Sequence, residues 1–105
     1  MSFNIQLVLQ DMLGAIKDST EADLSEIESY LKEILENEKE VFQTLAEQRI
    51  MGEITEDQLK SELEDEEDTL KAELKAIEVM TLAASQRAVN AAIDIFIKAV
   101  KEAIS

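Results

Sequence analysis

Glutamates occupy apolar positions in two segments with helical periodicity, and this is the pattern in the sequence that comes nearest to metal chemistry. Glu38 interrupts one heptad-spaced seam and Glu66 interrupts the next. If the two segments pair antiparallel about a turn near residues 52–55, facing residues have numbers that sum to about 107. Glu66 then faces Val41, about one helical turn from Glu38. We therefore expect these two carboxylates to be neighbours.

A carboxylate-only metal site is one interpretation of this pair, with Glu62 and Glu73 near the same level of the second segment completing the ligand set. Two copies of the pair would bring four carboxylates into one bundle, as in di-iron and di-manganese helical proteins. Ligands that are all oxygen favour Mg, Ca or Mn, and the Glu-x-x-His motif of those proteins is absent. The simpler interpretation is that the seam opens to water here, or that Lys39 or Lys71 pairs with the carboxylates.

A dense run of acidic side chains follows the predicted turn. It is too dense for a ligand signature, because it covers every side of the helix. Such a run is typical of a solvated surface that discourages aggregation. It could also dock on a basic protein, or imitate the phosphate spacing of DNA as acidic inhibitors of DNA-binding proteins do. The candidate docking residues are Glu62, Glu64, Asp65, Glu67 and Asp68.

Composition argues against an enzyme. The 105 residues include no His and no Cys, which removes the commonest general base, the commonest metal ligand and any thiolate nucleophile. No Gly-rich phosphate loop or Ser nucleophile motif is present, so no cofactor is expected apart from the divalent metal considered above. A net charge of −14 disfavours direct binding to nucleic acid, which is itself a polyanion.

The elements that must position these residues are helices. Proline is absent, glycine occurs twice, and strong helix formers dominate, so we predict a single all-α domain. Gly52 suits the end of a helix, and Thr55 to Gln58 form a capping box at the start of the next. A weaker boundary lies near Asp18 to Thr20. The predicted helices span about residues 3–17, 20–51 and 56–104.

These helices predict a long antiparallel hairpin with an amphipathic N-terminal helix. If the boundary near Asp18 is only a kink, the chain forms one hairpin about 70 Å long, with residues 3–17 beside residues 88–104. The alternative is that the first helix folds back across the hairpin to make a compact three-helix unit. The sequence leaves both open.

Residues 76–104 are apolar around most of the helix, and such a helix must be surrounded. One partner helix cannot do this, and the many alanines allow close approach of a second copy. We therefore predict a homo-oligomer, at least a dimer forming a four-helix bundle or a larger coiled-coil assembly. Its predicted interface consists of Ala84, Ala88, Ala92, Ile95, Phe96 and Ala99.

Charge follows the same division. Residues 18–78 carry 21 acidic and 6 basic side chains, whereas the two ends are nearly neutral. This favours a non-enzymatic assembly or adaptor protein that self-associates at its neutral end and presents an acidic arm to a protein partner. The alternatives are the carboxylate metal bundle, the acidic DNA mimic and a membrane-active protein whose first helix and residues 76–104 lie on a bilayer. No stretch of 18 residues is apolar enough to span a membrane, and we expect a cytoplasmic chain.

Two short motifs resemble those of small uncharacterised bacterial helical-hairpin proteins. These are G-E-I-T-E from Gly52 and A-x-x-x-A-V-N-A-A over residues 84–92. The resemblance covers about half of the chain. It implies a helical hairpin and brings no activity, cofactor or site with it.

Overall fold

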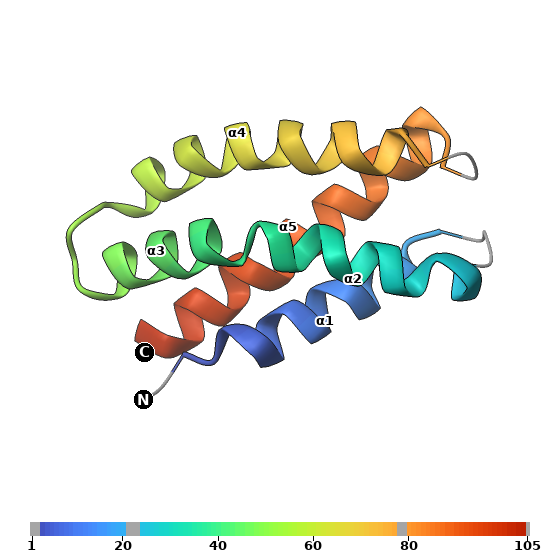
Figure 1. Ribbon diagram of the computed structural model, residues 1–105. Helices are drawn as coiled ribbons and strands as arrows, with labels where there is room; N and C mark the ends of the chain where they lie inside the picture. The colour runs from blue at the N-terminus through green and yellow to red at the C-terminus, as the bar shows by residue number, and fades with distance from the viewer. Residues whose placement is uncertain (1–2, 21–23, 78–79, 105) are drawn as a thin grey trace.

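The computed structural model describes residues 3–20, 24–77 and 80–104, and in these it contains five α-helices, one short 3₁₀ turn and no strand (Figure 1). The predicted all-α class is thus confirmed. The elements are α1 (Ile5–Asp18), η1 (Ser25–Ile27), α2 (Glu28–Asn37), α3 (Lys39–Ile50), α4 (Glu56–Lys75) and α5 (Leu82–Ile104).

Helix α1 agrees with the predicted amphipathic N-terminal helix. The Asn4 side chain caps it by accepting hydrogen bonds from the backbone N–H groups of Gln6 and Leu7, at 3.0 and 3.2 Å. One face of the helix is buried, through Val8, Leu9, Met12 and Ile16.

The predicted continuous helix over residues 20–51 is interrupted in the structure. Its regular part begins at Glu28, after η1, and it breaks at Glu38, whose backbone lies at φ −100° and ψ 5°. The Glu38 N–H donates to the Leu35 carbonyl at 3.1 Å, which is a tightened, 3₁₀-like bond. Helices α2 and α3 continue in nearly the same direction on either side of this break (Figure 1).

The turn between α3 and α4 is built as the sequence predicts. Gly52 has φ 77°, its N–H donates to the Arg49 carbonyl at 3.2 Å, and the Glu53 N–H donates to the Gln48 carbonyl at 2.8 Å, which is a Schellman ending. The capping box of α4 is present, because the N–H of Gln58 donates to the Thr55 hydroxyl and the Gln58 side chain accepts from the Thr55 N–H.

The predicted continuous helix over residues 56–104 is wrong. Helix α4 ends at Lys75, and α5 begins only at Leu82, where the Thr81 hydroxyl accepts a hydrogen bond from the Ala84 N–H at 3.0 Å. No proline or glycine causes this break. Its physical reason is tertiary: Ile77 and Met80, on the connection, are both buried in the core. Residues 78 and 79 of the predicted helix lie outside the described residues.

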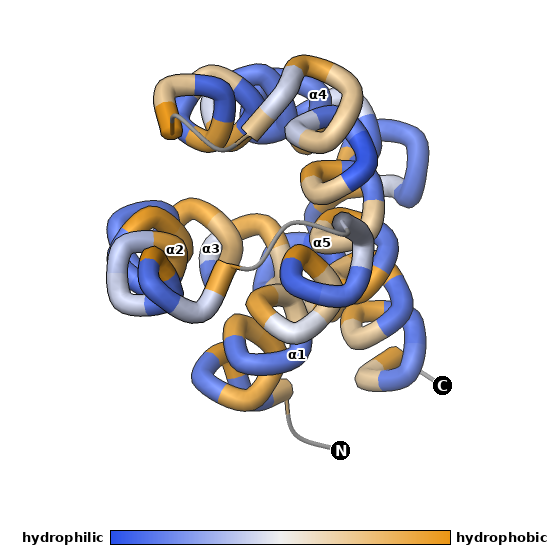
Figure 2. The backbone as a smooth tube through the Cα atoms, turned by 90° about the vertical axis from the view of Figure 1, so that its right-hand side faces the viewer, coloured by the Kyte–Doolittle hydropathy of each residue, from blue (hydrophilic) through white to orange (hydrophobic). Residues whose placement is uncertain are grey.

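The chain therefore folds back on itself instead of forming a 70 Å hairpin. Its longest dimension is 40 Å. We call the nearly collinear pair of helices α2 and α3 the α2–α3 rod. In Figure 1, α4, the α2–α3 rod and α1 lie one below another, and α5 crosses behind them to end beside the start of α1. Helix α5 packs against α1, α3 and α4, as the end-on view of Figure 2 also shows. Helix α1 folds back against α2 and α3, as in the compact alternative, but the described residues form five helices and not a three-helix unit.

The core lies around the crossing of α5. The ring of Phe96 stands 4.9 Å from that of Phe42 and 6.1 Å from that of Phe3, measured between centroids. Phe42, Phe96 and Met12 have no exposed surface. Side chains from α1, α3 and α5 thus meet in one cluster, which α2 and α4 extend.

The predicted oligomer interface is covered by the chain itself. Ala88, Ala92 and Phe96 are fully buried and Ala84 is 5% exposed, while Ile95 and Ala99 pack partly buried against the same core. The assignment of these residues to a contact between copies is therefore wrong. The sequence argument allowed α5 only one partner helix, whereas the fold surrounds it with three.

None of the helices in the described ranges combines the length and the apolar character needed to cross a lipid bilayer.

Candidate functional site

Three glutamates meet where α4 packs over the break between α2 and α3. The side chain of Glu38 lies within hydrogen-bonding reach of the side chains of both Glu66 and Glu73. Glu66 and Glu73 are seven residues apart, which places them on the same face of α4 as the buried Leu63 and Leu70. The predicted proximity of Glu38 and Glu66 is confirmed. We call these three residues the carboxylate cluster.

Glu66 is the buried member of the carboxylate cluster. It is 7% exposed, and its Oε2 atom lies buried without a hydrogen-bond partner. Burial raises the pKa of Glu66 to about 7, and the hydrogen bond and the charge of Glu38 add to the effect, followed by the charge of Glu73. The pKa of Glu73 is also raised, first by burial and then by Glu38.

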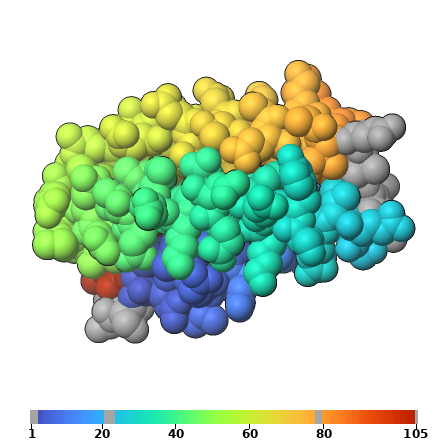
Figure 3. Space-filling view, viewed as in Figure 1, coloured from blue at the N-terminus to red at the C-terminus, as the bar shows by residue number. Residues whose placement is uncertain are grey.

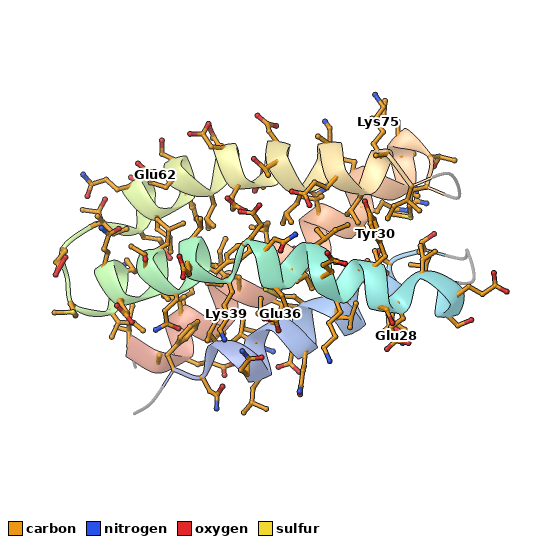
Figure 4. All side chains as sticks on the ribbon, in the orientation of Figure 1. Glu28, Tyr30, Glu36, Lys39, Glu62 and Lys75 are labelled. Carbon is orange, nitrogen blue, oxygen red and sulfur yellow. The ribbon has the colours of Figure 1, made fainter. Side chains whose placement is uncertain are left out.

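No cation among the described residues neutralises the carboxylate cluster. Lys71 donates to the Gln86 side chain on α5 at 3.1 Å. Lys39 points toward α1, where its ammonium group donates to the Gln6 side chain once the amide of Gln6 is oriented to satisfy both of its neighbours. Figure 4 shows Lys39 and Glu36 on this lower side of the α2–α3 rod, away from α4. The two lysines considered as partners from the sequence are thus occupied elsewhere.

The chemistry that fits this arrangement is the sharing of protons. A hydrogen bond between two carboxyl groups needs a proton on one of them. Within the described ranges, no group of three or more acidic side chains has the geometry to hold a metal ion. Glu62, proposed from the sequence as a further ligand, lies exposed on the outer side of α4, as Figure 4 shows.

The acidic run occupies the outer surface of α4, which forms the upper edge of the molecule in Figure 3. Glu62, Glu64, Asp65 and Asp68 are exposed, and Glu67 is half-buried. We call these five residues the acidic face. The ion pairs found among the described residues, Lys17–Glu28 and Lys101–Glu56 at 3.2 Å, include none of them.

A groove of about 440 Å³ runs beside the acidic face, between α4 and α5. Glu64 and Glu67 line it from α4, together with Lys60, and Asp94 lines it from α5 with the apolar Ile93 and Ile97. Burial raises the pKa of Glu67, and the charges of Glu64, Asp68 and Asp94 raise it further. Negative charge from two helices is therefore concentrated at this edge.

Sequence reasoning missed two parts of this region. Glu73 was named only as completing a metal-ligand set, although its side chain lies within hydrogen-bonding reach of Glu38. Nothing in the sequence places Asp94 beside Glu64 and Glu67, because that contact depends on α5 folding back. The spacing from Glu66 to Glu73 is the signal that could have identified the first.

Comparison with known proteins finds no significant match to this chain. No family model matches the chain, and neither a curated protein nor a solved structure matches it significantly.

Proposed function

We propose that this chain is a non-catalytic binding module that presents the acidic face of α4 to a basic protein partner. The observation that carries the proposal is the exposure of Glu62, Glu64, Asp65 and Asp68 along one helix with no ion pair to them in the described part of the chain. The whole of α4 carries nine acidic and three basic side chains.

The acidic face is supported by a rigidly held helix. This favours a role in binding a partner over a role only in keeping the chain soluble. Helix α4 is held by a capping box at Thr55 and by the buried leucines of its inner face. A charged surface fixed on a packed helix needs little ordering when a partner binds, so less free energy is lost on association. Long-range attraction would also speed the encounter with a basic surface.

The groove beside the acidic face fits the side chain of a lysine or arginine. Its carboxylates come from Glu64, Glu67 and Asp94, and its apolar floor from Ile93 and Ile97 suits the methylene stem of a long basic residue. Such a residue would place its charge among the carboxylates and its stem on the isoleucines. A basic helix or extended peptide is the matching kind of partner.

A matched pair of variants tests this proposal. One variant neutralises the acidic face (Glu62→Gln, Glu64→Gln, Asp65→Asn and Asp68→Asn). The other neutralises four exposed glutamates elsewhere (Glu26→Gln, Glu33→Gln, Glu40→Gln and Glu53→Gln), so that the two have the same net charge. The measurement is fluorescence anisotropy of a labelled oligo-arginine peptide at low and at physiological salt.

We expect the first variant to bind the peptide about tenfold or more weakly than the unmodified chain, and the second to bind nearly as well as it does. Equal losses in the two variants would mean that net charge alone attracts the peptide, which contradicts a specific face. Circular dichroism on both variants serves as the folding control, because all eight positions are exposed.

Imitation of DNA is a narrower form of the same proposal. It adds the expectation that the chain displaces duplex DNA from a basic DNA-binding protein, such as a linker histone, and that the acidic-face variant does not. If the chain binds oligo-arginine but leaves the DNA complex intact, the narrower form is excluded.

Self-association stays a prediction that requires another surface, because α5 is already covered. Light scattering, which gives the native mass, tests whether the chain self-associates. A mass near 11.8 kDa is that of one chain and would remove the oligomer from the proposal.

A further inference from the structure

We propose that Glu38, Glu66 and Glu73 form a proton-binding latch, in which protons shared between α4 and the α2–α3 break hold the acidic helix against the rest of the fold. This inference does not depend on the binding partner proposed above. It rests on where the three carboxyl groups lie and on what surrounds them.

The carboxylate cluster lies between two elements, α4 and the α2–α3 rod, and can therefore act as a latch between them. Glu38 is the residue at which the α2–α3 rod breaks, and Glu66 and Glu73 lie on the facing side of α4. Both close carboxyl pairs of the cluster, Glu38 with Glu66 and Glu38 with Glu73, therefore connect α4 to the rod. Each pair can form a hydrogen bond only when one of its two carboxyl groups carries a proton.

Burial makes the loss of the proton costly. Glu66 is 7% exposed, and its free Oε2 atom has no partner that could stabilise a negative charge. The charged groups that act on Glu66 are Glu38 from the α2–α3 rod and Glu73 from α4 itself, and both are acidic. From α5, the nearest acidic influence on α4 is Asp94, which acts on Glu67.

Helix α4 is the element that such a charge would move most easily. Its buried side chains form a single stripe, of which Glu66 is the central member, between Leu63 and Leu70. When Glu66 ionises, its negative charge faces Glu38 and Glu73 without a cation between them. Repulsion then acts directly on the contact that holds α4 to the rod.

The direction of the pH dependence follows from linkage. Burial and Glu38 raise the pKa of Glu66 from 4.5 to about 7 in the folded chain. Between these two values the folded chain holds a proton that the unfolded chain has lost. The stabilisation from the protonated cluster is therefore complete at acidic pH and is lost as the pH rises through about 7.

The experiment compares the unmodified chain with Glu66→Gln and with Glu62→Gln. Glutamine keeps the shape of a protonated glutamate and cannot ionise, and Glu62→Gln makes the same chemical change on the exposed side of the same helix. Thermal unfolding is followed from about pH 5 to about pH 8. Amide hydrogen exchange by NMR then reports α4 and α5 separately.

We expect the melting temperature of the unmodified chain and of Glu62→Gln to fall with rising pH by on the order of 10 °C more than that of Glu66→Gln. Exchange in α4 should accelerate over the same range, while exchange in α5 changes little. Parallel pH curves for the unmodified chain and Glu66→Gln would overturn the proposal.

Two further measurements keep the proposal falsifiable if Glu66→Gln folds poorly. Glu38→Gln removes a charge and a hydrogen bond that raise the pKa of Glu66, so the pH midpoint should move to lower values. An unchanged midpoint would contradict the latch. Millimolar CaCl₂ or MnCl₂ that stabilises the unmodified chain at about pH 8, but not Glu38→Gln, would replace the proton by a metal ion and overturn it as well.

Discussion

Helices α4 and α5 follow each other in the chain and pack against each other, yet they are held in the fold in different ways. Helix α4 buries one stripe of five residues, one of them a glutamate, and exposes a strongly acidic outer surface. Helix α5 buries eight residues and is covered by α1, α3 and α4. Loosening α4 would expose one helix face, whereas loosening α5 would open the whole core.

This contrast explains where each kind of function can reside. Charge is tolerated on α4 because water solvates it, and a buried carboxyl in its stripe can make one contact depend on pH without dissolving the core. On α5 the same change would have to be absorbed by three neighbouring helices. We therefore expect binding and regulation at α4 and structural support from α5.

The sharpest way to break the contrast is to remove the central ring of α5. Phe96→Ala deletes a fully buried side chain that contacts Phe42 and Phe3, so the free energy of unfolding should fall by about 3–5 kcal/mol. Leu82→Ala, at a position of α5 that is 55% exposed, is the control and should cost much less. Urea unfolding measures both. Equal losses in the free energy of unfolding for the two variants would mean that the core does not lie around Phe96.

A smaller difference in stability is expected when the same side-chain volume is added to α5 and to α4. Ala88→Leu on α5 inserts a side chain where there is no exposed surface, and overpacking should cost about 1–3 kcal/mol. Ala72→Leu makes the same change on the exposed side of α4 and should leave stability nearly unchanged. If Ala88→Leu instead proves neutral in thermal unfolding, α5 is not enclosed as described.

The smallest effect concerns the helix ends. Thr55→Ala removes the capping box of α4 and should destabilise the chain by about 1 kcal/mol. Thr81→Ala removes the hydroxyl that caps the first turn of α5. Amide exchange should quicken in the first turn of α4 for Thr55→Ala and near Ala84 for Thr81→Ala. A change spread evenly over both helices would contradict local capping.

The features predicted correctly from the sequence depend on residues that are close in the chain or joined by one short turn. The turn at Gly52 follows from the conformational freedom of glycine, and the start of α4 follows from Thr55 and Gln58. Counting outward from this turn brings Glu38 near Glu66 with little accumulated error. For this reason the proximity of Glu38 and Glu66 could be predicted from the sequence.

The incorrect predictions share the opposite property. The helix over 56–104 was predicted to be continuous because no proline or glycine stands near Ile77 and Met80, and Thr81 alone is a weak signal for a new helix. Once the break was missed, the packing of α5 against α3 and α4 was missed too, and its alanines were assigned to a second copy. The predicted position of residues 3–17 beside residues 88–104 agrees with the packing of α1 against α5. The groove containing Asp94 could not be predicted either, since it exists only after α5 returns beside α4.

The sequence by itself determined the all-α class, the turn at Gly52, the acidic character of α4 and the approach of Glu38 to Glu66. Local hydrogen bonds, helix propensity and the 3.6-residue period of the helix suffice for these features. Only the tertiary structure decided that α4 ends at Lys75 and that α5 is enclosed by its own chain. Burial of Ile77, Met80 and Phe96 stabilises that arrangement, and burial depends on contacts between residues far apart in the sequence.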